Sequence, residues 1–121
     1  MKLVTLSLLL MSSLAFAQTE TASVAGTWKI HSTVAGNESD STCTFVQKDS
    51  ELTGTCKSEQ GESKLSGKVE GKKVSWSYNA DYNGTALTIK YSGTVAGDKM
   101  SGDESVDPFG VSGDFTATLS K

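Results

Sequence analysis

Short segments of alternating apolar and polar residues, separated by turn signals, fill the chain from Val24 onward. The turn signals recur every 8–13 residues, and no stretch of this part has the 3.6-residue periodicity of an amphipathic helix. This pattern is typical of an all-β domain. The predicted two-residue turns are Gly36-Asn37, Asp49-Ser50, Gln60-Gly61, Gly71-Lys72, Asn83-Gly84, Gly97-Asp98 and Pro108-Phe109. Seven tight turns predict an eight-stranded antiparallel meander.

These turns pair the apolar face of each strand with the apolar face of the next strand. Because a one-residue slip would exchange the two faces of a strand, this agreement tests the assignment. The predicted pairs are Trp28 with Phe45, Gly54 with Gly67, Leu65 with Tyr78, Gly67 with Trp76, Trp76 with Tyr91, Val95 with Met100, and Glu104 with Gly113. We therefore expect one apolar face to run through the whole meander.

Inward-facing glycines favour closure of this meander into a barrel. An apolar residue followed by Ser or Thr and then Gly occurs at Leu52-Thr53-Gly54, Leu65-Ser66-Gly67, Tyr91-Ser92-Gly93, Met100-Ser101-Gly102 and Val111-Ser112-Gly113. Glycines on the apolar face let strands bend and coil, as a small barrel requires. We predict an all-β fold over residues 24–121, a single eight-stranded antiparallel up-and-down barrel, with a two-sheet sandwich as the alternative.

The first 17 residues have the pattern of a signal peptide. Lys2 precedes an apolar run from Leu3 to Leu14, and Ala15-Phe16-Ala17 fits the cleavage rule. Residues 18–23 are then a flexible tail, and no other segment is long and apolar enough to span a membrane. The remaining chain has 10 Lys and no Arg against 14 acidic residues, a net charge of −4, which argues against a nucleic-acid partner. We expect a secreted or periplasmic protein of one domain.

The two cysteines test the predicted register. If Asp49-Ser50 is a turn, Cys43 lies directly opposite Cys56 in a closely spaced pair, within reach of a disulfide. Export to an oxidising compartment favours this disulfide over a redox pair or two free thiols. Two cysteines cannot make a structural zinc site, so we expect no metal and no cofactor.

No residue pattern indicates catalysis. The only histidine, His31, alternates with Trp28 and Ile30 and therefore faces outward, beside Lys29. A catalytic triad needs a nucleophile and an oriented acid around the histidine, and nothing in the sequence marks either. We expect no catalytic residues and a protein that is not an enzyme, with His31 as an ordinary solvent-facing side chain.

One row of inward positions has the composition of a ligand site. It contains Trp28, Phe45, Gly54, Gly67, Trp76, Tyr91, Glu104 and Gly113. An inward Glu104 indicates water, a ligand or a bond to the hydroxyl of Tyr91, because glutamate is almost never buried unpaired. The predicted ligand-binding residues are Trp76, Tyr78, Tyr91 and Glu104. The alternative is a bulge before Asp107-Pro108 that turns Glu104 outward and leaves the aromatic residues as plain core.

Alternate turns of a meander share one end of a barrel, so the turns near residues 36, 60, 83 and 108 should lie together. The polar stretches from Glu38 to Ser41 and from Asp103 to Phe109, with Tyr82, also fall at this end. We expect the ligand to enter there, because binding residues are often carried on loops at the edge of a rigid scaffold. The opposite end has compact turns and should be closed by Trp28.

The segment Ala25-Gly26-Thr27-Trp28 resembles the Gly-x-Trp start of calycin-type barrels, the lipocalins and avidins. The similarity to avidins continues through Leu52-Thr53-Gly54-Thr55, Leu65-Ser66-Gly67, Val74-Ser75-Trp76 and Tyr91-Ser92-Gly93. The resemblance implies a calycin-like barrel in which Trp28 is the barrel-end plug and Trp76 a wall tryptophan. It does not extend to the ligand, since the lipocalin arginine and the late-strand avidin tryptophans have no counterpart here.

The chain also resembles small periplasmic inhibitors of metallopeptidases, in which an N-terminal tail enters the protease cleft; residues 18–23 would be that tail. Our leading interpretation is a secreted, non-enzymatic barrel that binds a small apolar or amphipathic ligand. The alternatives are a protein-binding module, such as a periplasmic protease inhibitor, and a structural envelope protein. A ligand binder should have a cavity lined by Trp76 and Tyr91, whereas an inhibitor should have a filled barrel and an ordered or protruding segment before Val24.

Overall fold

The computed structural model describes residues 21–59 and 61–120, and these residues form eight strands and no helix. The strands are β1 (Gly26–Val34), β2 (Asn37–Lys48), β3 (Glu51–Ser58), β4 (Gly61–Glu70), β5 (Lys73–Tyr82), β6 (Thr85–Ala96), β7 (Lys99–Asp107) and β8 (Val111–Leu119). The predicted signal peptide over residues 1–17 and residues 18–20 of the predicted tail lie outside the described residues. None of the described residues belongs to a helix long and apolar enough to cross a membrane.

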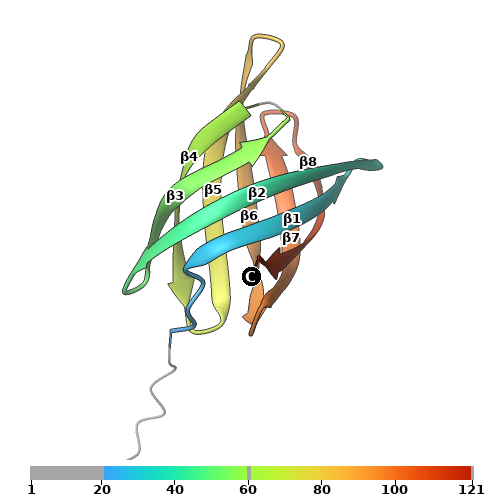
Figure 1. Ribbon diagram of the computed structural model, residues 1–121. Coiled ribbons are helices and arrows are strands. Elements are labelled where there is room, and N and C mark those ends of the chain that lie inside the picture. The colour runs from blue at the N-terminus through green and yellow to red at the C-terminus, as the bar shows by residue number, and fades with distance from the viewer. Residues whose placement is uncertain (1–20, 60, 121) are drawn as a thin grey trace, which may run out of the picture.

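Each strand pairs with its neighbours in sequence, and β1 also pairs with β8. The sheet therefore closes on itself in the order β1 to β8 (Figure 1). All eight pairings are antiparallel. This confirms the predicted up-and-down barrel and rules out the two-sheet sandwich. Closure leaves no long unpaired strand edge.

Five of the seven hairpins have the predicted register. Asn83 and Gly84 have φ of 51° and 84°, the left-handed conformation that a type I′ turn requires at both central residues. Lys48 pairs with Glu51, Glu70 with Lys73 and Ala96 with Lys99, as their turn residues indicate. Across the last turn, Glu104 pairs with Gly113, also as predicted.

Two hairpins differ from the prediction by two residues. The first turn is Ala35-Gly36, with φ of 52° and 80°, so Val34 pairs with Asn37. The predicted pair of Trp28 with Phe45 is therefore wrong, and Trp28 lies opposite Cys43. The cause is that the turn uses a left-handed alanine, which the sequence does not mark.

The second difference is in the β3–β4 hairpin, where Ser58 pairs with Gly61. The predicted pair of Gly54 with Gly67 is therefore wrong, because Gly54 lies opposite Leu65 and Leu52 lies opposite Gly67. A shift of two residues keeps every side chain on its face of the sheet. The inward face was thus predicted correctly even where the partner was not.

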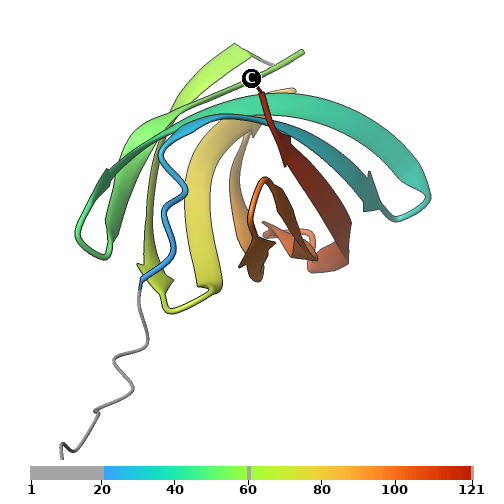
Figure 2. The same cartoon turned by 60° about the horizontal axis from the view of Figure 1, so that its bottom comes forward.

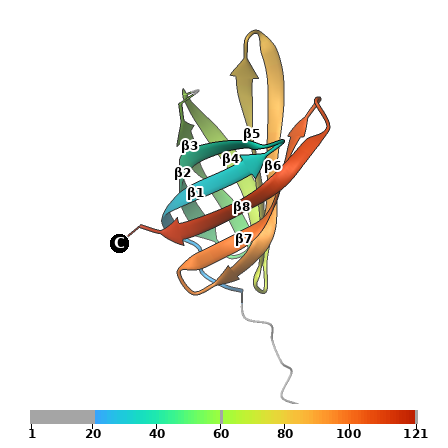
Figure 3. The same ribbon diagram turned by 90° about the vertical axis from the view of Figure 1, so that its right-hand side faces the viewer.

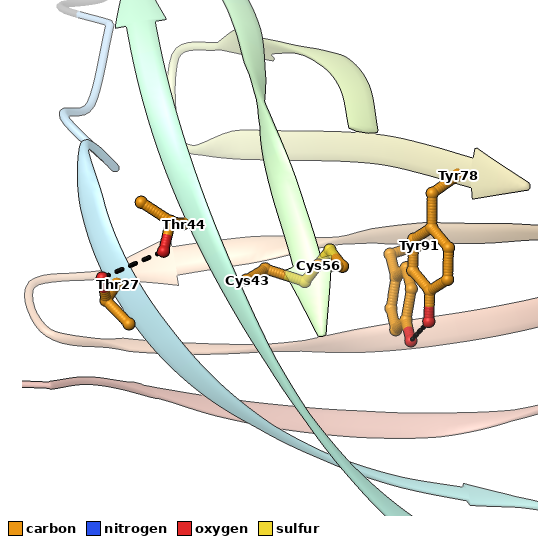
Figure 4. Close-up of a disulfide and its surroundings, with 6 residues drawn as sticks. All are labelled: Thr27, Cys43, Thr44, Cys56, Tyr78 and Tyr91. Carbon is orange, nitrogen blue, oxygen red and sulfur yellow. Dashed lines mark hydrogen bonds between the residues drawn. A yellow bond between two sulfur atoms is a disulfide. The ribbon is translucent and has the colours of Figure 1, made fainter. Parts of the chain in front are cut away.

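Cys43 and Cys56 are paired residues on β2 and β3 and form a disulfide, which confirms the prediction. Their Cα atoms are 4.0 Å apart, and both side chains are buried inside the barrel. Figure 4 shows this bridge together with the exposed hydrogen bond between the hydroxyls of Thr27 and Thr44, 3.1 Å apart, on the neighbouring pair of strands. A bridge between these positions stabilises the fold mainly by restricting the unfolded chain.

The barrel interior is a continuous apolar core in which Gly67 makes room for Trp76. These two residues are directly opposite each other on β4 and β5. A Cβ atom on Gly67 would lie 2.1 Å from the Ser75 carbonyl oxygen and 2.7 Å from the Trp76 Cα. Glycine therefore permits the close backbone approach that the coiled strands need at this point. This is the role that the sequence predicted for the inward glycines.

The end of the barrel that carries the β2–β3, β4–β5 and β6–β7 turns is closed by the segment before β1 (Figure 2). Val24 is buried there, and its carbonyl accepts a hydrogen bond of 3.0 Å from the indole Nε1 of Trp28, which is also buried. Trp28 thus lies at the end where it was predicted. We call this the closed end.

The side chain of Gln47 holds the segment in place. Its Oε1 accepts a hydrogen bond of 2.7 Å from the Val24 N–H, and its Nε2 donates to the carbonyls of Ala22 and Asp49 at 2.9 and 3.0 Å. The N–H of Ala22 donates to the Gly71 carbonyl at 2.8 Å. Residues 22–24, of which 22 and 23 belong to the predicted tail, are therefore bonded to the barrel.

Candidate functional site

The end opposite the closed end holds a cavity of about 320 Å³. We call this end the mouth; it carries the β1–β2, β3–β4, β5–β6 and β7–β8 turns, and the β5–β6 hairpin extends farthest from the barrel (Figure 3). The cavity is lined by Val34, Glu38, Ser39, Asp40, Ser41, Ser58, Glu59, Tyr78, Leu87, Ile89, Tyr91, Glu104 and Val106. Its position at the predicted end follows from the meander, in which alternate turns meet.

The inward alternation of two neighbouring strands builds one wall of the cavity. Leu87, Ile89 and Tyr91 occupy alternate positions on β6, and all three are buried. Glu104, which is buried, and Val106, which is partly buried, occupy alternate positions on β7, where Glu104 pairs with Tyr91 and Val106 with Ile89. Because β7 runs from Glu104 toward the mouth, Glu104 and Tyr91 lie deeper than Ile89 and Val106. The wall therefore changes from apolar near the mouth to polar in its depth.

A column of aromatic rings forms the inner part of the site. Tyr91 stacks on Trp76 with ring centroids 4.7 Å apart and an interplanar angle of 10°, and on Tyr78 at 6.0 Å and 24°. Phe45 and Phe115 contact Trp76 edge-on at 4.9 and 5.4 Å. These contacts hold the Tyr91 ring in place, because stacked and edge-to-face aromatic pairs stabilise the fold beyond the burial of their apolar area.

The two tyrosine hydroxyls are adjacent in the cavity. Their oxygens are 3.3 Å apart, and Figure 4 shows the two rings side by side with the hydroxyls directed toward each other. Burial raises the pKa of both Tyr78 and Tyr91, and for Tyr91 the neighbouring Tyr78 and Glu104 raise it further. Both hydroxyls are therefore neutral at ordinary pH and can each donate one hydrogen bond.

Glu104 is the one acidic side chain buried within the described part of the barrel, and it is only 6% exposed. Its carboxylate is hydrogen-bonded with Tyr91, which contributes to the raised pKa of that tyrosine. Because a carboxylate can only accept, Tyr91 is the donor of this bond. The Oε2 atom of Glu104 is buried and has no hydrogen-bond partner among the described residues. Glu104 thus faces inward, as the leading interpretation of the sequence required, and not outward.

Three of the four predicted ligand-binding residues line the cavity: Tyr78, Tyr91 and Glu104. Trp76 does not line it and instead packs beneath Tyr91, where its buried indole Nε1 has no partner among the described residues. Trp76 therefore supports the position of Tyr91. The sequence placed it on the correct face but could not give its depth in the barrel.

Sequence reasoning did not single out the apolar walls Val34, Leu87, Ile89 and Val106. A signal was present, because Leu87 and Ile89 precede Tyr91 by four and two residues on the same face. Val106 likewise follows Glu104 by two residues toward the mouth. These positions become part of the site only because their strands extend beyond the filled section of the barrel.

His31 lies on the outer surface of β1, as predicted. Its Nδ1 is 2.7 Å from an oxygen of Asp40 and its Nε2 is 3.4 Å from an oxygen of Glu38, both on β2. The hydrogen bond with Asp40, then that with Glu38, raises the pKa of His31. No nucleophile is bonded to this histidine in the described structure, and the described residues contain no group of three His, Cys, Asp or Glu side chains that could hold a metal ion.

Neither a scan against protein-family models nor a search of curated proteins gives a match to this sequence, so the assignment of a function rests on the geometry of the cavity.

Proposed function

We propose that this protein is a secreted or periplasmic, non-enzymatic, calycin-like barrel that binds a small amphipathic ligand in the mouth cavity. The observation that carries the proposal is the cavity itself, about 320 Å³, in which Leu87, Ile89 and Val106 form one apolar wall above Tyr91 and Glu104, and polar residues between 38 and 41 and at 58 and 59 line another side. Binding sites for small molecules commonly combine largely apolar walls with a few placed polar groups. The location is supported by the disulfide, since such bridges persist in oxidising compartments.

The filled part of the barrel supports the same proposal. Trp76 packs beneath Tyr91 and is contacted edge-on by Phe45 and Phe115, so buried aromatic rings fill the interior below the cavity. The closed end is sealed by Val24 and Trp28, which leaves the mouth as the entry. A preformed cavity loses little conformational entropy on binding.

An uncharged dye tests this proposal. N-phenyl-1-naphthylamine should bind the wild-type protein with saturable enhancement of its fluorescence at one site per chain. Leu87→Trp adds a large side chain to the cavity wall and should abolish this binding. The matched control is Val46→Trp, on the outer face of β2, where the side chain is exposed and the dye should still bind. Absence of saturable binding to the wild type, or equal binding to Leu87→Trp, would contradict the proposal.

The second candidate is a protein-binding module such as a periplasmic protease inhibitor. It is supported by the exposed side chains of Tyr82 and Phe109, which lie at two turns of the mouth. Exposed aromatic residues are enriched at interfaces between proteins. It ranks below the ligand proposal because the barrel interior holds a cavity at the mouth, whereas an inhibitor is expected to have a filled barrel. Inhibition of a periplasmic metallopeptidase that is lost on deletion of residues 18–23 would reverse this order.

A further inference from the structure

The charged side chains around the cavity all have the same sign. The described residues that line it include Glu38, Asp40, Glu59 and Glu104 and no lysine, arginine or histidine. Glu38 and Asp40 direct their carboxylates to His31 on the outer surface, and Glu59 is at the rim. Because the carboxylates of Glu38 and Asp40 point away from the cavity to His31, Glu104 is the acidic side chain that lies buried inside it.

The second, independent observation is the unpartnered oxygen of Glu104 in the depth of the cavity. The side chain is more than nine-tenths buried, and its Oε2 has no hydrogen-bond partner among the described residues. Leaving such an acceptor buried and unsatisfied destabilises the folded protein, and a charged group does so more than a neutral one. A ligand that carries a donor, and above all a positive charge, would remove this destabilisation.

The remaining groups near Glu104 also suit a cation. The hydroxyls of Tyr78 and Tyr91, whose rings are stacked on each other, are 3.3 Å apart and lie in the same cavity as Glu104. The oxygens of these neutral hydroxyls can accept hydrogen bonds from an ammonium group, which is a donor only. Closer to the mouth, Leu87 and Ile89 offer apolar surface and no hydrogen-bonding side chain.

We propose that the mouth cavity selects a small organic cation, a protonated primary amine on an apolar body, with its ammonium group at Glu104 and its apolar part against Leu87 and Ile89. This inference rests on the proposed function and specifies its ligand class. Leu87 and Ile89 bury the body of the amine, and Glu104 accepts a charge-assisted hydrogen bond from its head group.

A set of three probes with the same apolar body tests the preference for charge. Hexylamine, hexan-1-ol and hexanoate would each be titrated into the wild-type protein at pH 7 by isothermal titration calorimetry. We expect hexylamine to bind at least about tenfold more tightly than hexan-1-ol, because hydrogen bonds with ionised partners are roughly twice as strong as neutral ones. Hexanoate should bind most weakly, since its carboxylate would face Glu104.

Two substitutions on β7 assign the preference to one side chain. Glu104→Gln keeps the size of the residue and removes its charge, and should reduce the affinity for hexylamine to that for hexan-1-ol. Asp103→Asn is the matched control, because it removes the same charge from the adjacent position, whose side chain is exposed on the outer surface. The control should retain the preference for the amine.

The outcomes separate this inference from the function on which it rests. If hexan-1-ol or hexanoate binds the wild type as tightly as hexylamine, the cation proposal is wrong and the small-ligand function stands. If Glu104→Gln keeps the amine preference, or Asp103→Asn loses it, the assignment to Glu104 is wrong. If none of the three probes binds and the dye does not bind either, the proposed function itself fails.

Discussion

The two ends of the barrel differ in whether their buried polar groups have hydrogen-bond partners. At the closed end, the indole N–H of Trp28, the N–H of Val24 and the amide of Gln47 all have hydrogen-bond partners. At the mouth, Glu104 is buried with one oxygen unpartnered beside a cavity. Both ends are built from the same alternation of inward and outward residues on the same strands.

This difference indicates a division between stability and binding. Buried polar groups in a finished core are almost always satisfied, and Val24 and Trp28 follow this rule at the closed end, whereas the indole Nε1 of Trp76 in the filled core is an exception. Departures from it are expected where a site must leave a group available to a partner. Substitutions at the closed end should therefore lower the free energy of unfolding and leave ligand binding unchanged. Substitutions at the mouth should weaken ligand binding and barely change the free energy of unfolding.

The largest effect should come from the plug of the closed end. Trp28→Ala removes a side chain that is 1% exposed, and should lower the free energy of unfolding by about 3–5 kcal/mol. Urea denaturation followed by circular dichroism measures this loss. Tyr82→Ala, at the exposed tip of the mouth, is the control and should change stability by about 0.5 kcal/mol or less. Similar losses in the two variants would contradict the division between the ends.

The next effect concerns the segment before β1. Gln47→Ala leaves the N–H of Val24 without its acceptor and the Ala22 carbonyl without a donor. We expect a loss of about 1–3 kcal/mol, the cost of unsatisfied buried groups. Amide hydrogen exchange should accelerate at Val24 and stay unchanged at Ile89 in the mouth wall. Equal acceleration at both amides would mean that the two ends unfold together.

At the mouth, the substitution Glu104→Gln should barely affect stability. Glutamine can still accept a hydrogen bond from Tyr91, and the substitution removes a buried charge that lacks a full set of partners. We expect the free energy of unfolding to change by about 1 kcal/mol or less, or to rise. The same urea titration measures it. A loss as large as that of Trp28→Ala would show that Glu104 is a structural residue.

The smallest effect is on the outer surface, at His31. Because Asp40 and Glu38 raise its pKa above the ordinary value of 6.5, protonated His31 favours the folded state. This contribution is complete below the unfolded pKa and is lost as the pH rises through the higher folded pKa. In an NMR titration, Asp40→Asn should bring the pKa of His31 down toward 6.5, whereas Asp103→Asn should leave it unchanged. An unaltered pKa in Asp40→Asn would contradict the assigned cause.

Much of the strand order and register was predictable, because each hairpin is specified by its own turn residues and by the alternation of its two strands. Asn83-Gly84 specified its turn through backbone conformation, and the pairing of Cys43 with Cys56 followed by counting outward from Asp49-Ser50. The left-handed Ala35 was not predictable, because alanine rarely adopts that conformation. It moved the partner of Trp28 by two residues without changing the face on which Trp28 lies.

The sequence by itself determined which side chains face inward, since alternation along a strand is a local property of the extended backbone. It therefore predicted Tyr78, Tyr91 and Glu104 as inward residues. Only the tertiary structure decided how deep each one lies in the barrel. Depth depends on how far neighbouring strands are offset along the barrel, and one of these offsets, between β1 and β8, is not set by a connecting turn. That closure places Trp76 in the filled core and Glu104 at the cavity, although both belong to the same predicted row.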